Sequence, residues 1–213
     1  REPPHHTPQP TGRQVGRRRT WPAPAALIAA AVLWAALSSF GVGLTWDESI
    51  HIGYVGNYHG WFASVRQSGF DGQLFTAPVL HAVWQSGQAH PPLGKIAMLA
   101  TFEVFDGFVP SYIALRLASV CWFAVALTAL YHLVRLGSNR RAALCATAML
   151  ALLPRFMGHS HIAAYDMPVA ALWTVTALFA RLSLKRRRYA AALGVSVGLA
   201  LLTKINGFFI PFA

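Results

Sequence analysis

Long apolar segments alternate with shorter polar ones over most of the chain. A helix needs about 20 apolar residues to cross a hydrocarbon core roughly 30 Å thick. The pattern therefore predicts an all-α integral membrane protein with about five transmembrane helices, at residues 25–44, 112–134, 142–154, 167–184 and 189–203. Asp166 and Pro168 fit the N-cap and the first turn of the fourth helix.

The composition supports a membrane protein. Hydrophobic residues make up 55% of the 213 residues and charged residues only 12%, and the mean hydropathy is +0.43. Such values exclude an ordinary soluble domain. Residues 1–22 differ, because they are rich in Pro, His and Arg. They predict a disordered basic cytoplasmic tail ahead of a transmembrane domain at residues 23–213.

Most of the positive charge falls in three clusters between the apolar segments. The formal net charge of +11 could by itself indicate a nucleic-acid partner. The clusters lie, however, where the positive-inside rule expects cytoplasmic loops. We therefore predict contact with the lipid bilayer and not with nucleic acid. The clustered residues are Arg1, Arg13, Arg17, Arg18, Arg19, Arg135, Arg140, Arg141, Arg181, Lys185, Arg186, Arg187 and Arg188.

The segment at residues 91–105 could be counted as a further crossing. That topology would place the second basic cluster outside, against the positive-inside rule, and Lys95, Glu103 and Asp106 lie in or beside the segment. We predict instead a juxtamembrane helix on the outer surface, within a first extracytoplasmic loop at residues 45–112.

Asp47 and Glu48 directly follow the first apolar segment and so lie at the membrane surface. Two adjacent carboxylates at that depth repel each other, which indicates a shared proton, a cation or a substrate nearby. Two solvated acids at a helix end are the alternative.

Five basic residues lie outside the clusters, and the predicted topology places all of them outside or in the outer part of a span. Measured along each helix from its inner end, Arg155 and Lys204 lie about 20 Å towards the outer surface, and Arg116 lies about 27 Å in the same direction. Cations there are costly unless they face a protein interior or an anion, so a buried phosphate is a natural partner. Each could instead reach lipid headgroups. The other two are Arg66 and Lys95.

Carboxylates that face a phosphate site indicate group transfer from a membrane-embedded phosphate ester. Asp47 fits a general base that activates an acceptor hydroxyl. Arg116, Lys204 and Lys95 fit cations that stabilise a leaving phosphate. The alternatives are a transporter or flippase of a lipid-linked sugar, whose charges should lie near the bilayer midplane, and a membrane module without catalysis.

Four runs of sequence resemble the protein O-mannosyltransferase family and its bacterial relatives, including the lipid A aminoarabinose transferase, among the GT-C glycosyltransferases. The resemblance extends in order from about Leu44 to Lys204, and the second run is its most specific part. The runs are WDE at residues 46–48, HPPLGK at 90–95, ALRL at 114–117 and GHSHIAAYDMP at 158–168.

The resemblance implies the N-terminal part of a GT-C fold and an inverting transfer of a sugar from polyprenyl or dolichyl phosphate to a protein, lipid or glycan acceptor. It implies Asp47 as the catalytic base, with Glu48 and Asp166 as further acids. It also implies Arg116 and Lys204 as donor phosphate ligands, to which the charge pattern adds Lys95 and Arg155.

Three histidines are candidates for substrate or loop contacts, namely His90, His159 and His161. Some relatives bind a metal through an acidic residue near the position of His90. A divalent metal ion is therefore a candidate cofactor with His90 as its ligand, and the alternative is that His90 orients the loop. The bacterial relatives predict a multi-pass protein of the bacterial inner membrane with its active site facing outward.

Overall fold

The computed structural model describes residues 22–84 and 90–212, and these ranges contain helices but no β-strand. The helices are α1 (Pro22–Ser38), α2 (Trp46–Ser68), α3 (Ala77–Trp84), α4 (Leu93–Phe105), α5 (Ser111–Gly137), α6 (Arg140–Leu152), α7 (Pro154–Ser160), α8 (Asp166–Ser183) and α9 (Ala190–Leu201). Short 3₁₀ turns lie at Ser39–Gly41, Gly72–Phe75, Arg187–Tyr189 and Ile205–Phe212.

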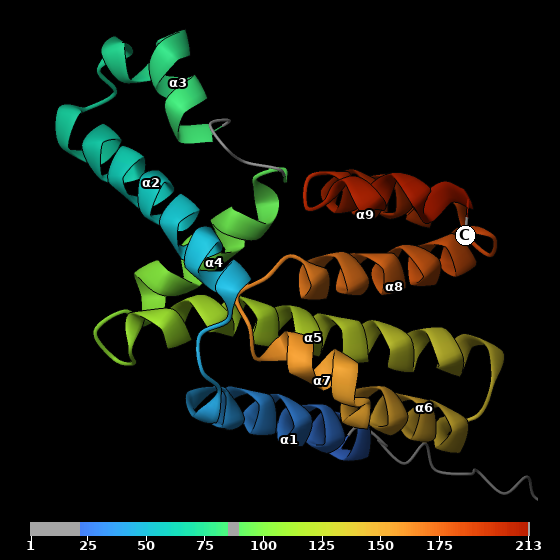
Figure 1. Cartoon of the computed structure of the whole chain (residues 1–213). Coiled ribbons are helices and arrows are strands. Elements are labelled where there is room, and N and C mark those ends of the chain that lie inside the picture. Colours follow the sequence, from blue (N-terminus) through green and yellow to red (C-terminus); the bar gives the residue numbers. More distant parts are fainter. Residues whose placement is uncertain (1–21, 85–89, 213) are drawn as a thin grey trace, which may run out of the picture.

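The helices α1, α5, α6, α8 and α9 lie side by side with roughly parallel axes (Figure 1). α5 is the central helix and packs against α1, α4, α6 and α8. Small buried residues such as Ala114, Ala118 and Ala126 line α5, and small side chains let neighbouring helices approach closely. Val120 and Phe123 add larger apolar contacts in the same core.

The helices α2, α3 and α4 lie at one end of this bundle (Figure 1). The helix predicted at residues 91–105 is present as α4, which packs against both α2 and α5. Glu103 of α4 also holds α2, since it lies 2.8 Å from His59 Nδ1 and 3.1 Å from Arg66 Nη2. The side chains of this group are exposed, so the contact contributes little to stability.

The prediction of five crossings is confirmed only in part. Within the described ranges, residues 22–41 and α5 are long and apolar enough to cross a membrane, and α6 with α7 could form a third span bent by 67°. α9 has 12 residues, which extend only about 18 Å, and α8 carries Asp166 and Arg181 near its two ends. Neither meets the same test of length and composition.

The described basic clusters lie at the turns after α5 and after α8, at the end of the bundle opposite α2 and α4 (Figure 1). Arg135 and Arg140 flank the first of these turns, and Arg186 lies in the second. The predicted basic tail at residues 1–22 lies outside the described residues except for Pro22, which begins α1. Charge is therefore distributed unequally between the two ends of the bundle.

Candidate functional site

The side chains of Glu48 and Arg116 form a buried ion pair between α2 and α5. Arg116 Nε lies 2.7 Å from Glu48 Oε1, and Arg116 Nη2 lies 2.8 Å from Glu48 Oε2. Only 1% of Glu48 and none of Arg116 is exposed. Two parallel N–H···O bonds give such a pair both strength and a defined orientation.

Each N–H of Arg116 has an acceptor. Its Nη1 atom donates to the carbonyl oxygens of Ser39 and Val42, and its Nη2 atom donates to that of Gly43, all at 2.8 Å. A guanidinium has five N–H groups, and these three bonds together with the two to Glu48 use all five. The segment between α1 and α2 is thereby held against α5.

Glu48 is bonded just as completely. Its Oε1 atom accepts from the backbone N–H of Ala163 at 2.8 Å, and Oε2 accepts from that of Thr45 at 2.9 Å. Burial alone would raise the pKa of Glu48, but the hydrogen bonds from Arg116, Thr45 and Ala163 outweigh burial and hold this pKa below its ordinary value. The ion pair thus joins α5, the start of α2 and the loop before α8.

This network bears on the role predicted for Arg116 as a ligand of the donor phosphate. Arg116 has no N–H left to offer and no exposed surface. Contact with a phosphate would require bonds to Glu48 or to backbone carbonyls to break, so that role stays a prediction. The geometry supports a structural role instead, in which the pair holds the first turn of α2 and with it Asp47.

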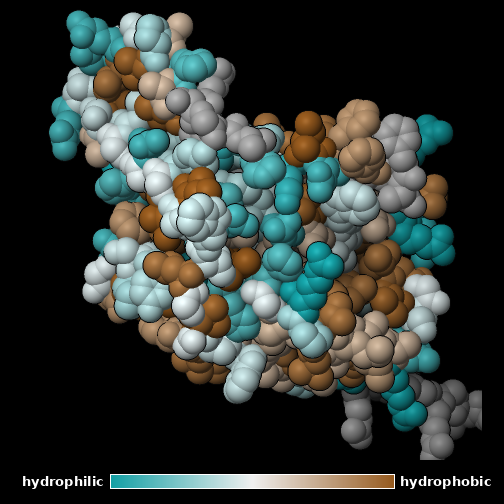
Figure 2. All heavy atoms as spheres, in the orientation of Figure 1, coloured by the Kyte–Doolittle hydropathy of each residue, from teal (hydrophilic) through white to brown (hydrophobic). Residues whose placement is uncertain are grey.

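Beside the ion pair, titratable side chains gather where α2, α4 and α8 meet, and Figure 2 shows a strip of hydrophilic side chains in this part of the surface. Asp47 is exposed on the first turn of α2, and His51 follows one turn later on the same face. Burial lowers the pKa of His51. The nearby groups of His90 and Lys95 lower this pKa further, whereas Asp47 and Asp166 raise it. All four of these charged or titratable groups therefore lie close enough to His51 to affect its pKa.

Asp166 and Lys204 form a second ion pair in this cluster. Lys204 Nζ lies 2.7 Å from Asp166 Oδ1, and His159 Nδ1 lies 3.8 Å from Asp166 Oδ2. The prediction that Asp166 is the N-cap of its helix was wrong by one residue, because Tyr165 occupies the N-cap. Asp166 lies in the first turn, where the helix dipole favours a carboxylate.

Lys95 of α4 is buried, with 1% of its surface exposed. Its ammonium donates a hydrogen bond to the carbonyl of His90 at 2.7 Å. It also lies 5.4, 5.7 and 6.0 Å from the ring centroids of Tyr54, Tyr58 and Tyr165. Burial lowers the pKa of Lys95 to about 8. The carbonyl and the three aromatic rings thus hold the ammonium group of Lys95 in the interior of the cluster.

Two residues that were not predicted as site residues, Tyr165 and His51, lie in this cluster, although Tyr165 falls within the run at residues 158–168. The ring centroid of Tyr165 is 4.2 Å from that of His51 and 5.1 Å from that of His90. The Tyr165 ring also packs directly on Gly94, where an added Cβ would overlap with it. The glycine in the HPPLGK run is the signal that could have indicated such a close approach.

We expect Gly94→Ala to lower the free energy of unfolding by about 1–3 kcal/mol, because the new methyl group forces the Tyr165 ring to move. Thermal unfolding of the purified protein measures this effect. Gly53→Ala on α2 is the matched control, since its methyl group meets open space and should be neutral or stabilising by up to about 1 kcal/mol. Equal stability of the two variants would contradict the tight contact.

Arg155 and His161 lie outside the cluster. Arg155 is exposed at the start of α7 and makes no hydrogen bond or ion pair within the described part of the chain. Arg155, Arg116 and Lys204 are therefore not brought into one group, although a common depth was predicted for them. The Nε2 atom of His161 lies 2.6 Å from Ser38 Oγ, so His161 joins the loop before α8 to the end of α1.

Among the described residues, His90 has no set of partners that would hold a metal ion. Within residues 22–84 and 90–212, no three His, Cys, Asp or Glu side chains are grouped closely enough to hold one. Bound zinc, for comparison, is usually held by three or four protein ligands. The geometry of these residues therefore gives no support to the metal-binding role considered for His90.

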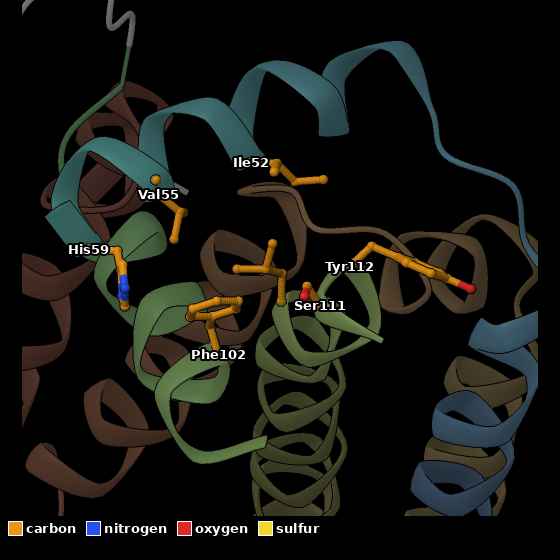
Figure 3. Close-up of a pocket in the computed structure, with 8 residues that line it drawn as sticks. Ile52, Val55, His59, Phe102, Ser111 and Tyr112 are labelled. Carbon is orange, nitrogen blue, oxygen red and sulfur yellow. The ribbon is translucent and has the colours of Figure 1, made fainter. Parts of the chain in front are cut away.

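A cavity of about 490 Å³ lies beside the cluster, between α2, α4 and the start of α5. Its lining is mostly apolar, and Figure 3 shows Ile52 and Val55 of α2 above Phe102 of α4. Leu115, which also lines it, directly precedes Arg116. The cavity is thus adjacent to the buried ion pair but separate from the polar cluster.

Comparison with known proteins identifies one family. A family model described as dolichyl-phosphate-mannose-protein mannosyltransferase matches residues 89–213, which is more than half of the chain. The matched range contains Lys95, Arg116, Asp166 and Lys204, whereas Asp47 lies before it. No curated protein and no solved structure matches the chain.

Proposed function

The chain belongs to the dolichyl-phosphate-mannose-protein mannosyltransferase family, and we propose that it is an inverting glycosyltransferase acting on the extracytoplasmic side of the membrane. Membership of this family indicates transfer of a sugar from a lipid-linked donor. The proposed donor is a polyprenyl- or dolichyl-phosphate sugar, and the proposed acceptor is a hydroxyl group of a protein, lipid or glycan. The observation that carries the proposal is the exposed carboxylate of Asp47 beside a cluster that contains Lys95 and Lys204.

Asp47 is the proposed catalytic base. In an inverting transfer, the acceptor oxygen bonds to the anomeric carbon as the bond from that carbon to the phosphate oxygen breaks. The acceptor proton passes to the base, and the electron pair of the broken bond leaves with the phosphate. Asp47 is exposed and open to a hydroxyl group, whereas Glu48 is fully bonded to Arg116 and the backbone. The two adjacent acids thus have separate tasks, proton transfer for Asp47 and positioning for Glu48.

Lys95 and Lys204 are the proposed ligands of the donor phosphate. Cations stabilise the negative charge that develops on a leaving phosphate. Both lysines lie close enough to His90 to lower its pKa, after the larger effect of burial. Asp166 keeps Lys204 oriented through their contact of 2.7 Å. In this proposal the two lysines bind the phosphate, whereas Arg116 holds the start of α2 through its pair with Glu48.

We further propose five crossings, with α8 and α9 as the last two, in a bacterial inner membrane. Support comes from the unequal charge of the two bundle ends, since the basic turns after α5 and α8 lie opposite α2 and α4 (Figure 1). By the positive-inside rule, the basic turns face the cytoplasm. Asp47 and the polar cluster then face outward.

A cysteine at position 138 tests this topology. Ser138 is exposed in the turn between α5 and α6, so we expect Ser138→Cys to react with a membrane-impermeant maleimide only from the cytoplasmic side. The background should carry serine in place of the exposed Cys121 and Cys145. Ser68→Cys at the end of α2 is the matched control and should react only from outside. Labelling of position 138 from outside would contradict the orientation.

The function itself is tested by sugar transfer from a panel of polyprenyl- and dolichyl-phosphate sugars to acceptor preparations, with the full-length protein in liposomes. We expect consumption of a lipid-phosphate sugar and a product with inverted anomeric configuration by NMR. Movement of the lipid-linked sugar across the bilayer without transfer would instead indicate a flippase. Retention of configuration would contradict the single displacement proposed here.

A further inference from the structure

Three buried polar atoms near the centre of the cluster have no hydrogen-bond partner in the described part of the chain. They are the hydroxyl oxygen of Tyr165 and the Nδ1 atoms of His51 and His90. Only 3% of Tyr165 is exposed, and both imidazole rings lie against its ring. Buried polar atoms are nearly always hydrogen-bonded, so three such atoms around one side chain indicate the place of a polar ligand.

The chemistry of these groups distinguishes them from the lysines of the same cluster. Burial raises the pKa of Tyr165 and lowers the pKa values of His51 and His90, so all three side chains favour their neutral forms near pH 7. A phosphate is best bound by charged donors. A neutral phenol donates a hydrogen bond, and a neutral imidazole can donate or accept one. Such groups match the hydroxyl groups of a sugar ring.

We infer that Tyr165, His51 and His90 form a subsite for the sugar ring of the lipid-phosphate donor, with the Tyr165 hydroxyl donating a hydrogen bond to a sugar oxygen. The inference rests on the proposed function.

The position of Tyr165 agrees with this assignment. Its ring centroid lies 6.0 Å from Lys95 Nζ, and the next residue, Asp166, pairs with Lys204. The subsite therefore adjoins both proposed phosphate ligands, as a sugar esterified to phosphate requires. Packing of the Tyr165 ring on Gly94 holds its hydroxyl in one place.

Tyr165→Phe tests the subsite, because it removes one hydroxyl group and keeps the ring. The full-length protein is titrated with two lipids that differ only in the sugar, dolichyl-phosphate-mannose and sugar-free dolichyl phosphate. We expect the variant to bind the mannosylated lipid about 10-fold more weakly, since a ligand group then loses its partner. Binding of the sugar-free lipid should be unchanged.

Tyr131→Phe, which removes a hydroxyl group from α5 beside His132, is the matched control and should bind both lipids as the wild type does. An equal loss for both lipids in Tyr165→Phe would assign the hydroxyl to phosphate binding or to folding and would overturn the sugar subsite. Unchanged binding of both lipids would overturn it as well. Wild-type protein that binds neither lipid would contradict the proposed function itself, and the subsite with it.

Discussion

Asp47→Asn should reduce sugar transfer by about 100-fold or more while leaving expression and donor binding largely intact. The amide has nearly the same size as the carboxylate but cannot take the proton of the acceptor, and a general base typically contributes about 10²- to 10⁴-fold to a rate. Asp47 is exposed and its neighbour Glu48 holds the turn in place, so the fold should tolerate the change. Transfer from the donor found by the lipid-phosphate panel, measured at saturating donor and acceptor, gives the change in kcat.

Asp71→Asn is the matched control for this experiment. Asp71 is an exposed N-cap at the 3₁₀ turn after α2, where its carboxylate accepts from the N–H of Gln73 at 3.0 Å. Asp71→Asn removes the same charge as Asp47→Asn, and we expect sugar transfer by this variant to remain at the wild-type level. If Asp47→Asn also transferred sugar with the kcat of the wild type, Asp47 would not be the catalytic base.

Arg116→Met should lower the free energy of unfolding by about 3–5 kcal/mol, because it leaves the buried carboxylate of Glu48 without its cation. The carbonyl groups of Ser39, Val42 and Gly43 lose their donors in the same variant. Reversible unfolding in mixed detergent measures the effect. Arg116→Lys should recover little of this lost stability, because an ammonium group offers three hydrogen-bond donors where the guanidinium uses five.

The exposed pair of Arg66 and Glu103 provides the control. Arg66→Met removes the same type of side chain from an ion pair at the surface, and it should cost less than about 1 kcal/mol. Stability of Arg116→Met equal to the wild type, together with a loss of donor binding, would contradict the structural role and restore Arg116 as a phosphate ligand.

The same ion pair predicts how stability depends on pH. The pKa of Glu48 is below its ordinary value in the folded protein, so the unfolded chain binds a proton first as the pH falls. The stabilisation by Glu48 is therefore complete above the ordinary carboxyl pKa and is lost as the pH falls through the folded value. Arg116→Met should remove most of this contribution.

The long apolar helices and α4 were predictable because their signals are local, whereas no helix bounds were predicted for α2, α3 and α7. Apolar length marks α1 and α5, and the Pro-Pro pair and flanking charges mark the start of α4 and its position at the end of the bundle. The number of membrane crossings was harder to predict from the sequence than the positions of these helices. α9 ends after 12 residues and a 3₁₀ turn follows, and hydropathy alone does not distinguish a short buried helix from a span.

The candidate site was predictable only as a set of charges at one end of the molecule. Asp166 and Lys204 were both expected there, and the fold brings them to 2.7 Å. The choice of partner for Arg116 was not predictable. A phosphate and the carboxylate of Glu48 both satisfy a guanidinium, and only the path of the chain between α1 and α2 decides which is present.

By itself, then, the sequence determined the helical class, the likeness to a family and the end of the molecule at which chemistry should be sought, because these depend on segment length, motif and loop charge. The tertiary structure decided which side chains meet. Glu48 reaches Arg116 across 68 residues and the N–H of Ala163 across 115, and the Tyr165 ring contacts His51, His90 and Gly94. Contacts over such separations depend on how whole helices pack, and a local sequence pattern does not predict that packing.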